Sequence, residues 1–236
     1  YNPGEPVLKG LNLTVKPGQK IAIVGATGAG KSTIIRLLMR YYDVSEGSVK
    51  IDGVDIRDYA TSDLRAKFGV VFQNDTLFKD TIRENIRLGR NLTDEQLLEA
   101  ARRAQALEFI EEQGGLDAPV AIKGANLSGG QKQRLLLARA LAGDPDILLL
   151  DDSSSALDYK TDAKLREEIR LHCADATKII IAQRISSIMH AEKIMVLENG
   201  NVIGMGTHEE LMETCPLYRE IGESQIGEGL AKEVHA

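Results

Sequence analysis

A glycine-rich run near the amino terminus has the residue types and spacing needed to bind phosphate: Gly25-Ala-Thr-Gly-Ala-Gly-Lys-Ser32. It matches the pattern G-x-x-x-x-G-K-S and lies between a predicted buried strand, Ile21–Val24, and a predicted helix, Thr33–Met39. Glycines let backbone N–H groups converge on phosphate oxygens, and the start of the helix adds a favourable dipole. We therefore expect this phosphate loop to bind a nucleotide, with Lys31 reaching the β- and γ-phosphates and Ser32 binding Mg²⁺.

Two further polar residues follow predicted strands and could complete a Mg²⁺ site. Asp151 comes directly after the apolar run Ile147–Leu150, an arrangement that holds Mg²⁺ opposite a phosphate loop. Gln73 follows a predicted strand over residues 69–72 and could reach both Mg²⁺ and an attacking water. The simpler alternatives are a carboxylate that merely ends a strand and a surface amide without a chemical role. Because phosphate loops occur in kinases, GTPases and many ATPases, these residues leave the enzyme class open.

A second glycine pair stands in the run Leu127-Ser-Gly-Gly-Gln131. Ser128 is a predicted N-cap, with Gln131 at the capping-box position, for a helix through Lys132–Leu141. One interpretation is therefore a well-capped helix and nothing more. Glycines in a helix, however, cost about 1 kcal/mol each relative to alanine, whereas a glycine-rich helix start allows an anion to approach closely. Two phosphate-binding helix starts in one chain favour a head-to-tail dimer, in which each phosphate loop faces the partner's second run.

The elements that must position these residues alternate between strand-like and helical runs, which is typical of an α/β fold. The dipeptides Asp52-Gly53 and Asn199-Gly200 predict two hairpins and hence an antiparallel β part beside the parallel sheet. Residues 81–142 are helical in pattern, with a capping box at Thr93 and Gln96. We expect a P-loop NTPase core with a mixed sheet, an antiparallel β subdomain and an inserted helical subdomain.

The predicted organisation is a single domain over residues 1–236. Its core comprises residues 1–80 and 143–222, its helical subdomain residues 81–142, and its flexible tail residues 223–236. A further capping box at Thr207 and Glu210 predicts a short helix near the carboxyl terminus.

Composition narrows the classes of function. The net charge of −6 argues against a broad nucleic-acid-binding face, which requires a basic surplus. Cys173 and Cys215 lack metal-like spacing and are expected to be reduced thiols in a cytosolic protein. No apolar run approaches the roughly 20 residues that span a bilayer, and no secretory signal is present. Because the sequence starts at Tyr1 without a methionine, we expect an excised domain whose membrane part lies on a longer chain or on another subunit.

In order and spacing, the phosphate loop, Gln73, the LSGGQ run, Asp151 and the run Ser155-Ala-Leu-Asp158 resemble the motifs of ABC-type ATPases. The resemblance covers about residues 1–220, and the runs 81–86 and 198–211 are similar to the exporter branch. It implies the ABC ATPase fold and the cofactors ATP and Mg²⁺.

The resemblance also implies the site residues. The nucleotide would be bound by Tyr1, which stacks on adenine, and by Gly25, Thr27, Gly28, Ala29, Gly30, Lys31, Ser32, Thr33 and Gln73. The Mg²⁺ ligands would be Ser32, Gln73 and Asp151. The LSGGQ run would be the signature, which completes the site of the partner with Ser128, Gly129, Gly130 and Gln131. The D-loop of the dimer would comprise Ser155, Ala156, Leu157 and Asp158. The catalytic residues would be Asp152, Gln183 and Gln73.

Two of these residues depart from the family pattern. Asp152 stands where the family has a glutamate that polarises the attacking water, and Gln183 stands where it has a histidine that contacts the γ-phosphate. An aspartate is one methylene shorter, and a misplacement of about 1 Å can cost about 100-fold in rate. Glutamine can form a hydrogen bond but cannot carry the positive charge of an imidazole. Neutral drift at tolerant positions is the alternative explanation. His190, seven residues after Gln183, is expected to be a surface helix residue without a role.

A further departure lies at residues 118–124, where exporters carry an acidic loop. Without the acidic residues, this loop is expected to make different contacts with the membrane part.

With its intact LSGGQ run, the chain therefore resembles the degenerate half of a heterodimeric bacterial multidrug exporter. We expect a Mg-ATP-binding and hydrolysing domain at the cytoplasmic face of the cell membrane, which powers export by ATP-driven head-to-tail dimerisation. Its partners would be a second ABC ATPase domain, of a different chain, and the transmembrane domains, but no nucleic acid. The alternatives are a regulatory ATP-binding module without turnover, a domain of a homodimeric exporter, and a soluble ABC ATPase acting on DNA or ribosomes. The short helical lobe and the acidic charge argue against the last.

Overall fold

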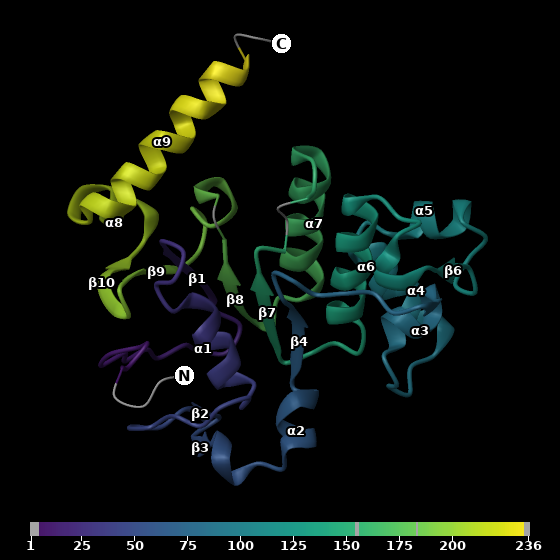
Figure 1. The fold of residues 1–236 in the computed structure, drawn as a ribbon, viewed down its shortest axis with the longest axis horizontal. Helices are drawn as coiled ribbons and strands as arrows, with labels where there is room; N and C mark the ends of the chain where they lie inside the picture. Colours follow the sequence, from purple (N-terminus) through teal and green to yellow (C-terminus); the bar gives the residue numbers. More distant parts are fainter. Residues whose placement is uncertain (1–4, 154–155, 183, 234–236) are drawn as a thin grey trace. The chain divides into compact units, whose positions relative to one another are not determined.

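The computed structural model describes residues 5–153, 156–182 and 184–233. The chain divides into two units, the first comprising Tyr1–Thr61 and Lys178–Ala236 and the second comprising Ser62–Thr177 (Figure 1). Across the described ranges, none of the helices combines the length and the apolar character that crossing a membrane requires. Each unit is built around buried parallel strands.

The first unit contains a mixed sheet in the order β10-β9-β1-β8. Its strands are β1 (Lys20–Gly25), β8 (Thr177–Ile181), β9 (Lys193–Glu198) and β10 (Asn201–Gly206). β1 pairs in parallel with β8 and with β9, whereas β10 runs antiparallel to β9. The central residues of β1 are buried on both faces, which explains why their sequence is an uninterrupted apolar run.

Both predicted hairpins are confirmed. β2 (Lys50–Ile51) and β3 (Val54–Asp55) pair antiparallel around Asp52-Gly53, whose φ angles are 52° and 81°. Asn199 and Gly200, with φ angles of 49° and 81°, connect β9 to β10 in the same way. Positive φ at both turn residues is what a two-residue hairpin requires. The first hairpin forms a separate small sheet, and the second extends the parallel sheet by an antiparallel strand.

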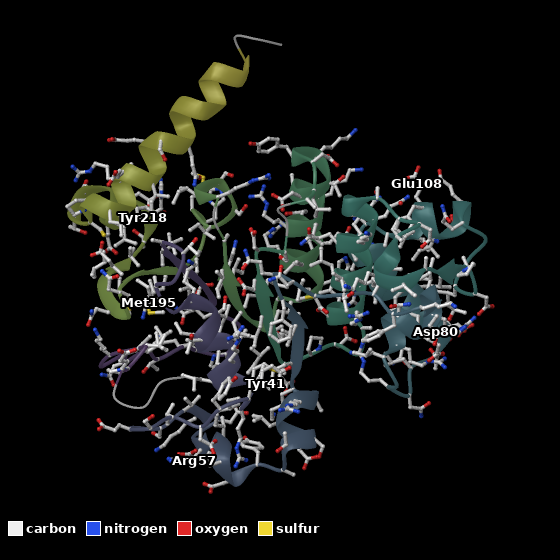
Figure 2. All side chains as sticks on the ribbon, viewed as in Figure 1. Tyr41, Arg57, Asp80, Glu108, Met195 and Tyr218 are labelled. Carbon is white, nitrogen blue, oxygen red and sulfur yellow. The ribbon has the colours of Figure 1, made fainter. Side chains whose placement is uncertain are left out.

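The remaining elements of the first unit follow the strands. They are α1 (Lys31–Leu38), η1 (Ile56–Asp58), η3 (Ile185–Ser187), α8 (His208–Thr214) and α9 (Pro216–Glu233). The capping box at Thr207 and Glu210 is confirmed at the start of α8. Arg57 lies beside β3 (Figure 2). It forms an ion pair with Asp55 at 2.7 Å, and hydrogen bonds from its guanidinium lower the pKa of Asp55 to about 2.

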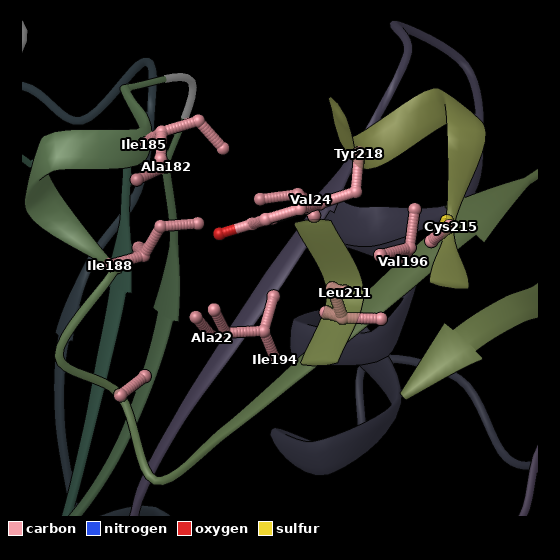
Figure 3. Close-up of a cluster of buried hydrophobic side chains, with 11 residues drawn as sticks. Ala22, Val24, Ala182, Ile185, Ile188, Ile194, Val196, Leu211, Cys215 and Tyr218 are labelled. Atoms are coloured by element: carbon pink, nitrogen blue, oxygen red, sulfur yellow. The ribbon is translucent and has the colours of Figure 1, made fainter. Parts of the chain in front are cut away.

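Tyr218 of α9 is the largest side chain in a buried cluster of the first unit (Figure 3). Its ring reaches toward Ile185 and Ile188, and its hydroxyl lies 2.9 Å from Nδ1 of His208. The other members of the cluster are Ala22, Val24, Ala182, Ala191, Ile194, Val196, Leu211 and Cys215. The cluster therefore joins β1 and β9 to η3, α8 and α9.

The second unit has a parallel pair of strands, β4 (Phe68–Val71) and β7 (Ile147–Asp151), with Val71 in register with Leu150. Its helices are α2 (Thr61–Ala66), α3 (Ile82–Arg87), α4 (Asp94–Arg103), α5 (Leu107–Glu112), α6 (Gly129–Leu141) and α7 (Tyr159–His172). α6 packs against β4, α3 and α4, and α7 packs against α4 (Figure 1). The capping boxes at Thr93 and at Ser128 are both confirmed.

The stretch predicted to be helical, residues 81–142, holds α3 to α6 but also contains short extended pieces. β5 (Asp80–Thr81) pairs with β6 (Pro119–Val120), and η2 (Ile122–Gly124) follows. The predicted boundaries of the helical subdomain, near residues 80 and 142, differ from the boundaries of the two units and stay a prediction. The flexibility of residues 223–236 also stays a prediction. α9 itself runs to Glu233.

Candidate nucleotide-binding site

The phosphate loop lies in the first unit, between the end of β1 at Gly25 and the start of α1 at Lys31. Gly25 has φ 152°, and a Cβ built there would lie 2.1 Å from the carbonyl oxygen of Leu197 in β9. Gly28 has φ 85°, but a Cβ there would meet no other atom within 4 Å. The fold thus requires glycine at 25 because of packing and conformation, and at 28 because of conformation alone.

Lys31 folds its side chain over the loop. Its Nζ donates hydrogen bonds to the carbonyl oxygens of Gly25, at 2.7 Å, and of Ala26, at 2.8 Å. Gly30, the N-cap of α1, has no side chain that could cap the first turn. A cation and an uncapped helix start thus meet at one place, which is a favourable environment for an anion.

Gln73, Asp151 and Asp152 lie in the second unit, at the carboxyl ends of adjacent parallel strands. Because Val71 is in register with Leu150, Gln73 and Asp152 each stand two residues further at the same edge. Asp151 is buried, with 4% of its surface exposed, whereas Gln73 is exposed in a turn. Asp152 is half-buried and adopts φ 52°, which is uncommon for a residue other than glycine.

The LSGGQ run forms the first turn of α6. Ser128 accepts a hydrogen bond from the backbone of Gln131 at 3.2 Å, and the Gln131 side chain accepts one from the Ser128 backbone at 2.9 Å. A Cβ on Gly129 would lie 3.7 Å from Cβ of Ala156, and one on Gly130 would lie 3.4 Å from the Ala156 carbonyl oxygen. These are ordinary contact distances, and neither glycine has a positive φ. This chain alone therefore has no need of glycine at either position.

Asp158 has a structural role that the sequence did not predict. As the N-cap of α7 it accepts hydrogen bonds from the backbone N–H of Thr161, at 2.9 Å, and from its hydroxyl, at 2.7 Å. These bonds, the backbone one above all, lower the pKa of the Asp158 carboxyl. Leu157 is buried and Ala156 is exposed. The carboxylate of Asp158 is thus engaged within its own chain.

The predicted site residues are distributed over both units. Gly25, Thr27, Gly28, Ala29, Gly30, Lys31, Ser32 and Thr33 belong to the first unit. Gln73, Asp151, Asp152, Ser128, Gly129, Gly130, Gln131, Ala156, Leu157 and Asp158 belong to the second. Tyr1, Ser155 and Gln183 lie outside the described residues. His190 is exposed, as predicted, but it stands in a turn rather than in a helix.

Sequence reasoning missed Arg139, which lies buried in α6 with 6% of its surface exposed. Its guanidinium donates to the backbone carbonyls of Asn85, at 2.7 Å, and Thr76, at 3.0 Å, and it pairs with Asp75 at 3.4 Å. Burial lowers the pKa of this arginine. The signal was available, because Arg139 is a lone charge in the apolar run 135–142. Arg139 holds in place the segment that follows Gln73.

Comparison with known proteins decides the family. A model of the ABC transporter family matches residues 8–155, which is more than half of the chain. The chain belongs to this family. Multidrug export ATP-binding/permease proteins of Staphylococcus aureus, strains NCTC 8325 / PS 47 and COL, are each 45% identical to it over 224 residues. The match covers 94% of this chain and 39% of each relative, so this ABC transporter domain spans about two fifths of their length.

A solved structure confirms the predicted ABC ATPase fold. The structure of a bacterial Atm1-family ABC exporter with ATP bound matches with a TM-score of 0.91 and 41% sequence identity. The match covers 96% of this chain and 40% of that one. The exporter-type resemblance seen in the sequence is thereby confirmed, and the chain is an ABC ATPase domain of that type.

The residues expected to hold Mg²⁺ fit that ion chemically. A serine hydroxyl, a glutamine amide and an aspartate carboxylate all present hard oxygen ligands, which Mg²⁺ prefers. Mg²⁺ also keeps few protein ligands when substrate phosphates and waters supply the others. Ser32, Gln73 and Asp151 therefore each have a side chain of a type that Mg²⁺ bound to a nucleotide accepts as a ligand.

Proposed function

We propose that this domain binds and hydrolyses Mg-ATP and powers export across a membrane by ATP-driven head-to-tail dimerisation. Its own nucleotide site would be slow, and its signature would serve the competent site of a different partner chain. The transmembrane domains of the transporter would be its other partners, at the cytoplasmic face of the membrane. The observation that carries the proposal is the contrast between the glycines of the phosphate loop and those of the signature.

At the phosphate loop, Lys31 would bind the nucleotide. Its ammonium now donates to two loop carbonyls, and phosphate oxygens of ATP would compete for the same donor. Ser32, Gln73 and Asp151 would hold Mg²⁺, which when bound neutralises charge on the β- and γ-phosphates. Tyr1 would stack on adenine. The remaining loop residues would contribute backbone N–H groups and the start of α1.

At the signature, the glycines are not required by the fold of this chain, which supports a role for them toward a partner. Gly25 cannot become alanine without striking the Leu197 carbonyl, so its glycine is explained within the chain. Gly129 has room for a methyl group and an ordinary backbone conformation, so an alanine there would favour the helix. A glycine that the fold does not need is explained by close approach from outside, as by a nucleotide on a partner. Ser128 and the N–H groups of this turn would face its γ-phosphate.

The slow hydrolysis assigned to the chain's own site rests on Asp152 and Gln183. The shorter carboxylate and the missing imidazole both weaken the handling of the attacking water and the γ-phosphate. The same two residues favour a second candidate function, a regulatory ATP-binding module without turnover. The two functions differ in whether turnover of the assembled protein depends on this chain's signature.

Two matched glycine variants test the proposal in the transporter assembled with its partner ATPase domain. Gly129→Ala should leave the free energy of unfolding unchanged or raise it by up to about 1 kcal/mol, because alanine favours the helix. It should nevertheless lower steady-state ATP hydrolysis roughly 10- to 100-fold, because the methyl group displaces the approaching phosphate.

Gly25→Ala is the counterpart and should destabilise the domain by more than about 1 kcal/mol, through its clash with β9. Unfolding is followed by chemical denaturation and turnover by phosphate release. Full turnover in the Gly129→Ala transporter would contradict the role of the signature in the partner's site.

A further inference from the structure

The side chain of Gln133, in the second turn of α6, joins that helix to the segment after β7. Its Nε2 donates to the carbonyl oxygen of Asp152 at 3.3 Å. Its Oε1 accepts from the backbone N–H of Ala156, also at 3.3 Å. The half-buried amide of Gln133 therefore contacts the backbone both before the D-loop, at Asp152, and within it, at Ala156.

The Asp152 carbonyl is a sensitive point for such a contact. Asp152 adopts φ 52°, a left-handed conformation that is strained for residues with a Cβ. The next residue, Ser153, is buried with 8% of its surface exposed. A donor on the carbonyl of Asp152 fixes the orientation of the peptide that follows it. It thereby favours the backbone from which the Asp152 carboxylate projects.

The same helix carries the signature. Gln133 stands four residues after Gly129, and residues at this spacing share one face of a helix. A Cβ on Gly129 or Gly130 would come within ordinary contact distance of Ala156, so the first turn of α6 lies next to this residue. The first turn of α6 thus adjoins the D-loop residue to which the amide of Gln133 is hydrogen-bonded.

We propose that Gln133 is a positioning residue that couples the signature turn at Ser128 to the backbone at Asp152 and Ala156. The inference rests on the proposed function for its meaning, since Asp152 would face this chain's own nucleotide and Ser128 the partner's. Displacement of the signature turn by the partner's nucleotide would then reach the carboxylate of this chain's own site through one side chain. Gln133 would touch neither nucleotide.

The residue type suits this role. A glutamine amide can donate to a carbonyl and accept from an N–H at the same time. Glutamate would keep the acceptor for Ala156 but lose the donor for Asp152. Methionine has a similar length and flexibility but forms neither bond. The two variants therefore separate one contact from the other.

Hydrogen exchange in the assembled transporter tests whether the coupling exists, without relying on turnover. Gln133→Met should raise the exchange rate of the Ala156 amide about fivefold, the effect of losing one net hydrogen bond. Gln133→Glu should retain the protection of this amide. Gln113→Glu, the same chemical change at an exposed position of the second unit, should alter nothing at Ala156. Unchanged Ala156 exchange in Gln133→Met would overturn the inference.

A double-mutant cycle then tests the connection to the signature. Ser128→Ala removes the cap of α6 and should raise exchange at Ala156 in the otherwise unchanged chain. On top of Gln133→Met it should add little, because the connection is already broken. Fully additive effects would show that the two residues act independently and would also overturn the inference.

Steady-state ATP hydrolysis provides the functional measurement. In a transporter whose partner site is inactivated, Gln133→Met should lower the kcat of this chain's own site several-fold and leave KM for ATP unchanged, because the phosphate loop lies on other elements. A change confined to KM would contradict the positioning role. If the unmodified transporter showed no ATP hydrolysis, the proposed function would fail, and the exchange results would still decide whether Gln133 couples the two segments.

Discussion

At position 152 the chain carries an aspartate with a left-handed backbone, directly after the buried Asp151. Two properties of the site meet at this residue: the reach of its carboxylate and the orientation of the peptide that follows it. Glutamate would extend the reach by one methylene but tolerates a left-handed conformation less well than aspartate. The proposed slow hydrolysis would therefore result from the short side chain of Asp152, on a backbone whose conformation is held by the contact with Gln133.

Restoring both departures should speed up the chain's own site. Asp152→Glu together with Gln183→His should raise hydrolysis there by about tenfold or more, because carboxylate reach and an imidazole both return. The measurement is phosphate release from a transporter whose partner chain has an intact signature but an inactivated site of its own. Asp175→Glu, an exposed change of the same chemistry, is the control. No gain in the doubly restored chain would show that these substitutions do not limit turnover.

At the level of elements, the packing of α8 and α9 on the sheet of the first unit depends on Tyr218. The ring is fully buried in the cluster with β1, β9 and η3. Burial raises the pKa of Tyr218 to about 12, because the ionised phenolate is disfavoured in the apolar cluster. The folded state thus holds the phenolic proton to higher pH than the unfolded chain does.

This pKa shift predicts how stability depends on pH. The contribution of neutral Tyr218 is fully present below pH 10, the ordinary tyrosine pKa, and is lost as pH rises toward 12. Over that window the free energy of unfolding should fall by roughly 2–3 kcal/mol on account of this residue. Tyr218→Phe should remove this part of the pH dependence, whereas Tyr159→Phe, at an exposed position, should not. Equal slopes for the wild type and Tyr218→Phe, in denaturation at several pH values, would contradict the assignment.

Elements with local signals could be predicted from the sequence. The capping boxes at Thr93, Ser128 and Thr207 and the two hairpin turns depend on residues within a few positions of one another. The short β5–β6 pairing could not be predicted in this way, because it joins residues about 40 positions apart and has little periodicity. For the same reason the contacts of Arg139 and Gln133 were missed: each depends on how a helix packs against distant segments.

In the candidate site, too, features with local sequence signals could be predicted, and features that depend on packing could not. The phosphate loop and the LSGGQ turn are continuous runs, so their local structures followed from residue order. The capping role of Asp158 could not be predicted from the motif resemblance, which assigns this residue to the dimer contact rather than to Thr161. The room beside Gly129 could be seen only in the folded chain. That room is what supports a partner-facing role for the signature.

At the level of the whole molecule, this ABC transporter domain represents about two fifths of the relatives that it matches. A membrane part and a second ATPase domain are therefore proposed from its resemblance to exporters. In the proposed asymmetric transporter, two sites on this chain have different roles. The site with Asp152 hydrolyses ATP slowly, and the signature with Ser128 supports hydrolysis by the partner. The alternative of a homodimeric exporter assigns equal work to both chains.

Two variants of this chain, compared in the transporter assembled with its partner ATPase domain, separate these two places most directly. Ser128→Arg would block the proposed approach of the partner's phosphate, and Asp152→Ala would remove only the carboxylate of the proposed slow site. Ser62→Arg, at an exposed position of α2, controls for the added charge and bulk.

The measurement is steady-state phosphate release at saturating Mg-ATP. We expect Ser128→Arg to lower turnover by about 100-fold or more, as for other losses of charge stabilisation at the transferred phosphate, while Asp152→Ala retains most of it. The reverse ranking, with turnover lost in Asp152→Ala and kept in Ser128→Arg, would show that this chain houses the working site and would contradict the proposed division of labour.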